Sequence, residues 1–300
     1  MTESRPFRLA PMAGWRCWSL LLALSLTAAC LLHPTLALQR PIYRYLVVID
    51  ITQSMNAQDY RQDGLPHDRL GYVKQSLRQT LGDLPCGSEL GLALFTTQNT
   101  QILFDPLEIC GHFAALDDAL EHVDWRMAWA ADSFIAHGLY SALDQLASRD
   151  RPARLVFFSD GQQIPEDLET PPYQGDRGAL AGLVVGVGGT EPVPIPRYDQ
   201  DNQPLGHWQR GDLDLGPGKQ APVGAADAPL LSRLDEQHLS TLAAATGLGY
   251  HRLTTSAALS RALQQPELAL RLKVETDIRP VLGLTALLVW LSGQLRWRWR

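Results

Sequence analysis

Strand-like and helix-like segments alternate along the middle of the chain. Continuous apolar runs, typical of strands buried on both faces, occur at 43–49, 153–159 and 179–188, and a short strand is predicted at 249–253. Apolar residues at every third or fourth position predict helices over 69–81, 113–123, 138–149, 238–247 and 256–265. This alternation predicts an α/β fold with a doubly wound, mostly parallel sheet flanked by helices. In such sheets the ligand site lies at the carboxyl ends of the strands.

A hairpin is predicted where two strand-like runs, 87–96 and 100–106, are separated by a few polar residues near Gln98. Cys86 and Cys110 stand equally far from that turn, at the base of the hairpin. A disulfide between them is plausible in an oxidising compartment, and a pair of buried free thiols is the alternative.

Seven prolines between Gly189 and Pro229 interrupt the alternation and indicate an insertion over 190–229. Its centre predicts a second hairpin with a polar turn around Asp199–Pro204. Asp199, Asp201 and Asn202 do not make a calcium loop, because no glycine follows at the required place and no acidic residue closes it.

Apolar stretches without charge lie near both ends of the chain, at 17–39 and 280–295. The first predicts a membrane anchor, with a cleaved signal peptide as the alternative; the second predicts a transmembrane helix, with a buried helix as the alternative. Arginines on the outer flanks predict that 1–16 and 296–300 are cytoplasmic. The domain at 41–265, followed by a linker at 266–279, would then face the periplasm from a bacterial inner membrane.

Charge is unevenly distributed along the 300 residues. The whole chain has a formal charge of −6, whereas residues 41–278 hold 18 basic and 31 acidic residues, a net −13. An acidic body of this kind argues against a nucleic-acid partner, because phosphate neutralisation supplies most of that affinity.

Hydroxyl and carboxylate side chains follow the ends of the predicted strands. Asp50-Ile51-Thr52-Gln53-Ser54 comes after the first strand, Ser133 precedes a predicted helix, and Ser159-Asp160-Gly161 ends a later strand. Each piece alone has a structural explanation as a helix cap or a turn. Together they offer oxygen ligands of the kind that suit a hard divalent cation.

This set of motifs resembles the von Willebrand factor A (VWA) domain and its metal-ion-dependent adhesion site, over about 41–265. Asp68-Arg69-Leu70 with Lys74, and Ser232-Arg233-Leu234-Asp235-Glu236, resemble further segments of that family. The flanking apolar segments and the insertion are similar to the membrane-anchored bacterial subfamily encoded beside MoxR-type ATPases. The stretch DITQSMNAQDY is similar to accessory VWA proteins of methanol oxidation systems.

The resemblance implies a metal site for Mg²⁺, or Mn²⁺ or Ca²⁺, with the ligands Asp50, Thr52, Ser54, Ser133 and Asp160. In the family the hydroxyls bind the metal directly and the carboxylates act largely through water, which leaves the ion able to recruit a carboxylate from a partner. Three positions depart from the commonest residues of the family: Thr52 replaces the middle Ser and keeps a hydroxyl, Ser133 stands for the usual Thr, and Ala136 stands for the usual Gly.

The resemblance therefore implies a protein-binding function, as an assembly or maturation factor for a periplasmic or membrane complex such as a methanol dehydrogenase-type system. The expected partners are a protein that supplies an acidic residue, other VWA proteins, a MoxR-type ATPase system and the membrane. An adhesion module and a metal-free scaffold are the alternatives. We expect no enzyme activity, since the sequence contains no Gly-x-Ser-x-Gly or His-Glu-x-x-His motif.

Overall fold

The computed structural model describes residues 14–62, 64–128, 133–163, 169–212 and 227–295. It divides the chain into two compact units, Pro41–Leu270 and a smaller one that combines Met1–Arg40 with Arg271–Arg300. The predicted basic tail at 296–300 and most of the predicted terminal segment 1–16 lie outside the described residues.

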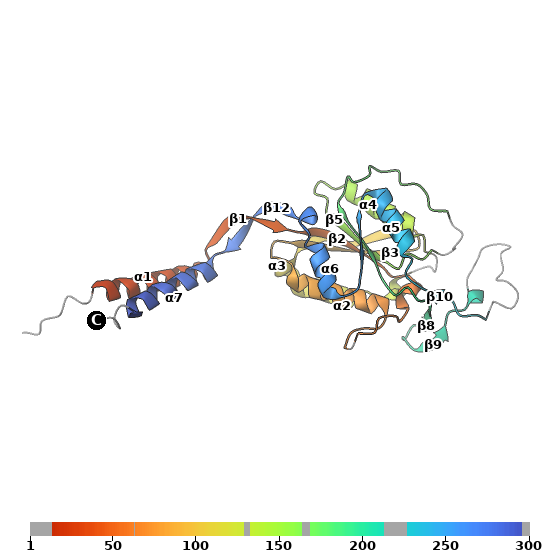
Figure 1. The fold of residues 1–300 in the computed structure, drawn as a ribbon, viewed down its shortest axis with the longest axis horizontal. Helices are drawn as coiled ribbons and strands as arrows, with labels where there is room; N and C mark the ends of the chain where they lie inside the picture. The colour runs from red at the N-terminus through yellow and green to blue at the C-terminus, as the bar shows by residue number, and fades with distance from the viewer. Residues whose placement is uncertain (1–13, 63, 129–132, 164–168, 213–226, 296–300) are drawn as a thin grey trace, which may run out of the picture. The chain divides into compact units, whose positions relative to one another are not determined.

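The larger unit is built on a six-stranded sheet (Figure 1). Its strand order is β11 (Gly249–Arg252), β6 (Gly182–Gly186), β5 (Arg154–Ser159), β2 (Arg44–Asp50), β3 (Glu89–Thr96) and β4 (Asn99–Glu108). All neighbouring pairs are parallel except β3 and β4. The predicted α/β fold with a mostly parallel sheet is therefore confirmed.

The strand order changes direction between β2 and β5. From β2 the chain builds outward through β3 to β4, and from β5 it builds outward on the other side through β6 to β11. Loops that leave the carboxyl ends of β2 and β5 therefore turn to opposite faces of the sheet, which opens a crevice for a ligand at this switch point.

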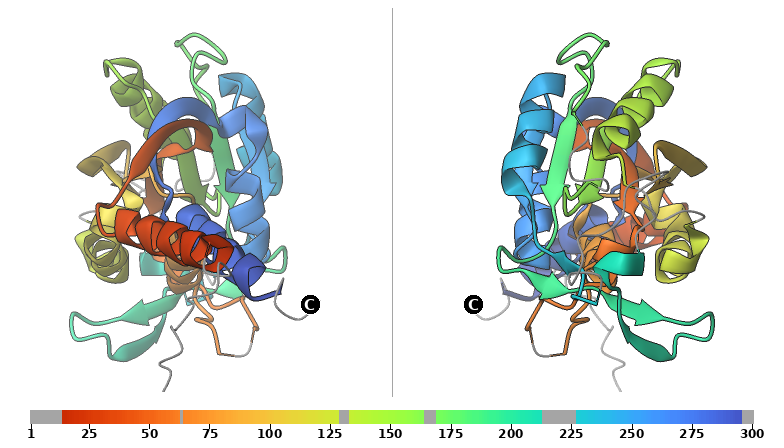
Figure 2. Two further views of the ribbon diagram at one scale, coloured as in Figure 1. Left: turned by 90° about the vertical axis from the view of Figure 1, so that its left-hand side faces the viewer. Right: turned by 90° about the vertical axis from the view of Figure 1, so that its right-hand side faces the viewer.

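Helices cover both faces of the sheet (Figures 1 and 2). Tyr45, Val47 and Ile49 of β2 belong to the core beneath α2 (Arg69–Asp83), α3 (Ile109–Glu121) and α6 (Ser256–Leu263). Leu46 and Val48 belong to the core beneath α4 (Ile135–Ala147) and α5 (Glu236–Thr246). The strand reads as a continuous apolar run because both of its faces are buried. The predicted helix end at Gly247 is confirmed, since this glycine caps α5 with a φ of 80°.

The hairpin of β3 and β4 turns where the sequence predicts, with Thr96 paired to Asn99. At its base Cys86 and Cys110 form a disulfide, with their Cα atoms 5.3 Å apart. The Glu108 carboxylate accepts hydrogen bonds from the backbone N–H groups of Cys110 and Gly111, which caps α3 beside the disulfide.

The proline-rich insertion consists of short strands. Strand β8 (Pro196–Tyr198) pairs antiparallel with β9 (Pro204–His207), which confirms the second hairpin, and β7 (Val193–Pro194) pairs with β10 (Leu231–Ser232). The Asp199 carboxylate accepts hydrogen bonds from the N–H groups of Asp201 and Gln203. These contacts use Asp199 to close the turn itself.

The smaller unit is a strand pair continued by a helix pair. Strand β1 (Thr35–Ile42) pairs with β12 (Leu270–Asp277), and α1 (Gly14–Cys30) packs against α7 (Arg279–Leu295). The two helices are antiparallel, because Arg16 donates a hydrogen bond to the Gln294 side chain and the Cys30 thiol donates one to the Arg279 carbonyl.

The prediction of two transmembrane helices, at 17–39 and 280–295, needs correction. In the described part of the chain, no helix combines the length and the apolar character that crossing a membrane requires. The segment 17–39 is divided between α1 and β1, and α1 and α7 have 17 residues each. At ~1.5 Å per residue, such helices are shorter than a hydrocarbon core of ~30 Å.

Candidate metal centre

The first predicted ligand, Asp50, ends β2 and is fully buried. One carboxylate oxygen accepts hydrogen bonds from the Thr52 backbone N–H at 2.9 Å and the Thr52 hydroxyl at 2.7 Å. The other oxygen accepts one from the Ser159 hydroxyl at 2.7 Å. Because Ser159 ends β5, this bond joins the two strands at the switch point, a role for Ser159 that the sequence did not predict.

Thr52 and Ser54 complete the first loop as a buried polar cluster. Their hydroxyl oxygens lie 3.3 Å apart, and Ser54 sits in the short helix η2 (Gln53–Asn56) that follows the strand. The structure thus brings together the three residues of the first motif, with their oxygens in one place.

Ser133 is held beside the end of β3, the other neighbour of β2. It bridges to Thr97, and the N–H of Phe134 donates a hydrogen bond to the Thr97 carbonyl at 2.7 Å. The Ser133 side chain is buried, and its hydroxyl has no hydrogen-bond partner among the residues that the structure describes. A buried hydroxyl in this state is unusual, because burial without a partner costs free energy.

Asp160 follows β5 and has a different environment. One of its oxygens accepts hydrogen bonds from the Arg69 guanidinium at 2.6 Å and the Ser232 hydroxyl at 3.1 Å. The other accepts one from the Gln162 backbone N–H at 3.1 Å. This predicted ligand is therefore already in an ion pair.

Arg69 is fully buried at the start of α2 and joins several loops. Besides Asp160, its guanidinium donates hydrogen bonds to the Asp59 carboxylate at 2.7 and 3.0 Å and to the Ser232 hydroxyl at 2.6 Å. The same Asp59 oxygen accepts a hydrogen bond from the Gly189 N–H at 2.8 Å, after β6. The sequence marked Arg69 and Ser232 as similar to family segments, but gave no sign that Asp59 would complete this network.

The two acids differ in their electrostatics. The pKa of Asp50 is raised to about 7, because burial and, after it, the nearby charge of Asp160 outweigh the hydrogen bonds from Ser159 and Thr52, which lower it. For Arg69, burial lowers the pKa, but the attraction of Asp160 and Asp59 outweighs burial, so that its pKa is raised. Within the described chain, Asp50 receives hydrogen bonds only from neutral donors.

The donor set fits a small hard cation. Among the described residues, no three His, Cys, Asp or Glu side chains are grouped so that they could hold a metal ion by themselves. Asp50, Thr52, Ser54 and Ser133 supply hydroxyl and carboxylate oxygens at adjacent strand ends, and no described residue is a hydrogen-bond partner of the Ser133 hydroxyl. Oxygen ligands of this kind suit Mg²⁺, Mn²⁺ or Ca²⁺.

Comparison with known proteins agrees with this fold. Residues 45–163 match the von Willebrand factor type A domain family, so the chain contains a VWA domain. Comparison with curated proteins found no match.

Two solved structures are similar over most of the chain. The first is an aerotolerance-related membrane protein from Bacteroides fragilis, with 16% identity, a TM-score of 0.50, and coverage of 74% of this chain and 97% of that one. The second is the conserved hypothetical protein BatB from Bacteroides thetaiotaomicron, with 17% identity, a TM-score of 0.49, and coverage of 74% and 95%. At such identities the likeness concerns the fold.

Proposed function

We propose that this VWA domain binds a protein partner through a divalent cation held by Asp50, Thr52, Ser54, Ser133 and Asp160. When bound, the cation would supply a coordination position for an acidic side chain of the partner. The observation that carries the proposal is the buried Ser133 hydroxyl, which has no hydrogen-bond partner among the described residues. It lies at a strand end next to that of Asp50, a buried carboxylate that has no ion pair with a described residue.

Each residue has a distinct part in this proposal. Thr52, Ser54 and Ser133 present neutral oxygens, and Asp50 supplies negative charge that no described cation compensates. Ser159 holds the Asp50 carboxylate in place. Asp160 contributes less charge than its type implies, because Arg69 neutralises it.

We also propose that the chain is associated with a membrane through α1 and α7. Large apolar side chains on both helices are exposed, among them Trp18 (71%), Leu24 (67%) and Val281 (65%). Exposed apolar surface on this scale is costly in water and is stabilised in a lipid environment. The similar protein from Bacteroides fragilis is also described as a membrane protein. A bacterial inner membrane with the VWA domain in the periplasm agrees with the Cys86–Cys110 disulfide.

The biological role that we propose is assembly or maturation of a periplasmic or membrane complex. The similarity of the stretch from Asp50 to Tyr60 to accessory VWA proteins supports a methanol dehydrogenase-type system and a MoxR-type ATPase as its setting. Other VWA proteins would be further partners in such a system.

A titration of the full chain in mild detergent with Mn²⁺ tests the cation site. Asp50→Asn should weaken binding by more than about ten-fold, because it removes the charge that no described cation compensates. Asp199→Asn is the matched control, since this aspartate only closes a turn of the insertion, and it should leave the affinity unchanged. Equal affinities in the wild type and Asp50→Asn would reject the site.

A further inference from the structure

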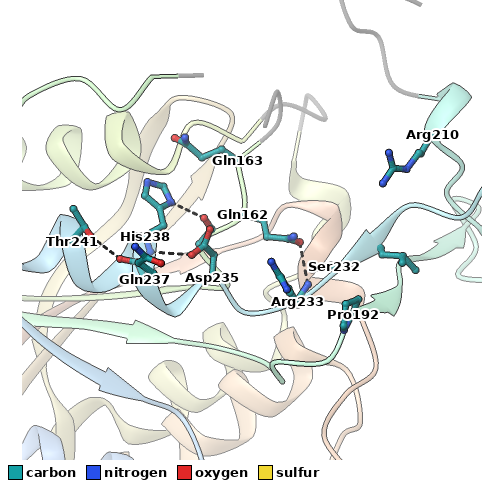
Figure 3. A pocket seen from close by; sticks show the side chains of 12 residues that line it. Gln162, Gln163, Pro192, Arg210, Ser232, Arg233, Asp235, Gln237, His238 and Thr241 are labelled. Carbon is teal, nitrogen blue, oxygen red and sulfur yellow. Dashed lines mark hydrogen bonds between the residues drawn. The ribbon is translucent and has the colours of Figure 1, made fainter. Parts of the chain in front are cut away.

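An open cavity of about 620 Å³ lies beside the loop that carries Asp160 (Figure 3). It is lined by Gly161–Gln163 after β5, by residues of the insertion, and by the chain from β10 to the beginning of α5. The insertion contributes Pro192 and Arg210, and Leu231 lies just after it in β10; the lining is otherwise mostly polar. The cavity is thus an open, hydrophilic surface depression next to the candidate metal centre.

Two contacts connect the cavity to the metal centre. Ser232 lines the cavity, and its hydroxyl donates to the Asp160 carboxylate and accepts from Arg69. Gly161, which directly follows Asp160, has a φ of 80°, and a Cβ there would lie 2.7 Å from a Leu239 side-chain carbon of α5. The glycine allows α5 to pack against the metal loop, so the wall of the cavity and the loop are one packed structure.

The cavity carries positive charge on an acidic domain. Arg210 and Arg233 line it, and neither makes an ion pair with another described residue, in contrast to Arg69 and Arg78. Asp235, the acidic residue of the lining, caps α5 by accepting a hydrogen bond from the His238 N–H at 2.9 Å. The cavity thus has two guanidinium groups in its lining that are not paired with a described acid, and such groups attract acidic side chains and repel basic ones.

We propose that this cavity docks an acidic segment of the partner protein. In this arrangement one partner carboxylate reaches the cation site, and acidic residues next to it in sequence pair with Arg210 and Arg233. The polar side chains of the lining can hydrogen-bond to the backbone of an extended peptide; they are Gln162, Gln237 and Thr241. An apolar helix would leave these polar groups without partners. The inference rests on the proposed function, because the cation would bind a carboxylate of the same segment.

A peptide selection tests it with the full chain immobilised in mild detergent. The probe is a library of ten-residue peptides with a fixed central Asp and flanking positions drawn from Glu, Gln and Lys, applied with Mg²⁺ or with EDTA. The wild type should retain peptides enriched in flanking Glu. The double variant Arg210→Gln/Arg233→Gln should lose that preference, with the enrichment of flanking Glu falling by roughly five-fold for each arginine removed. Its binding should still require the central Asp. The control Arg261→Gln, on α6, should keep the preference.

The outcomes separate this inference from the proposed function. Mg²⁺-dependent retention without a preference for flanking Glu, or with a preference for Lys, overturns the docking cavity and supports the cation site. Retention of Glu-rich peptides that is equal in EDTA and is lost in the double variant supports the cavity and overturns the cation-dependent function. No retention under either condition overturns both.

Discussion

The loops after β2 and β5 each carry a buried aspartate, but the fold treats the two carboxylates differently. Asp50 is surrounded by hydroxyl and N–H donors, and its pKa rises to about 7. Asp160, at the next strand end, pairs with the fully buried Arg69. The same residue type at equivalent positions thus serves two purposes. The protein's own arginine pairs with the carboxylate of the second loop, whereas the carboxylate of the first has no ion pair with a described residue.

The largest expected effect comes from removing the arginine. Arg69→Met should lower the free energy of unfolding by about 3–5 kcal/mol, because it leaves Asp160 and Asp59 buried with no positive partner. Urea denaturation of the full chain measures this. The control Arg78→Met breaks an ion pair whose arginine is 31% exposed, and should cost less than about 1 kcal/mol. Similar losses for the two variants would show that the Asp160 loop does not depend on its arginine.

A smaller effect is expected from pH, through Asp50. Cation binding needs the ionised carboxylate, so the affinity for Mn²⁺ should fall about ten-fold between pH 8 and pH 6, which straddles the pKa of about 7. In the absence of a cation, a rise in pH should lower the stability of the fold, although it raises the affinity for the cation. Between about pH 4 and pH 7 folded Asp50 keeps a proton that the unfolded chain has lost, so the free energy of unfolding decreases as pH rises.

Asp50→Asn is the control for this pH dependence, because the amide does not titrate. Denaturation of the cation-free variant at several pH values should lose the part of the slope that lies between about pH 4 and pH 7. An unchanged slope in Asp50→Asn would assign the titration to other groups and remove the electrostatic contrast between the two loops.

The smallest effect is expected at Ser133. Ser133→Ala removes a hydroxyl without a described partner, so the stability of the cation-free chain should change by less than about 0.5 kcal/mol. Mn²⁺ affinity should nevertheless fall several-fold, and Ser133→Thr, which keeps the hydroxyl, should restore it. A clear loss of stability with unchanged affinity would make Ser133 a structural residue of its loop.

The sequence predicted what depends on local pattern. The runs around Val47 and Val156 indicated buried parallel strands, and their order placed Asp50 and Asp160 at strand ends that turn out to adjoin. The hairpin between β3 and β4 followed from two apolar runs and a short polar turn. These features are encoded in residues close together along the chain, where periodicity is informative.

The rest of the site depends on tertiary contacts that the spacing of apolar residues along the chain does not predict. Arg69 occupies the first turn of a helix, where an arginine is usually solvated, and only tertiary packing buries it against Asp59 and Asp160. The strand β1 was hidden inside an apolar run that continues from α1. For β12 a signal existed, since Leu270–Asp277 alternates apolar and polar residues, but its partner lies at the other end of the chain.

The network around Arg69 delays completion of the candidate metal centre during folding. Its hydrogen bonds reach Asp160 across 91 residues and Ser232 across 163, and Ser159 reaches Asp50 across 109. Contacts so distant in sequence form late in folding, because each must close a long loop. A nascent chain that has not yet produced β10 lacks Ser232 and holds Arg69 without its full set of partners. Under the proposed function, capture of a partner would be reserved for a domain whose synthesis has passed beyond the insertion.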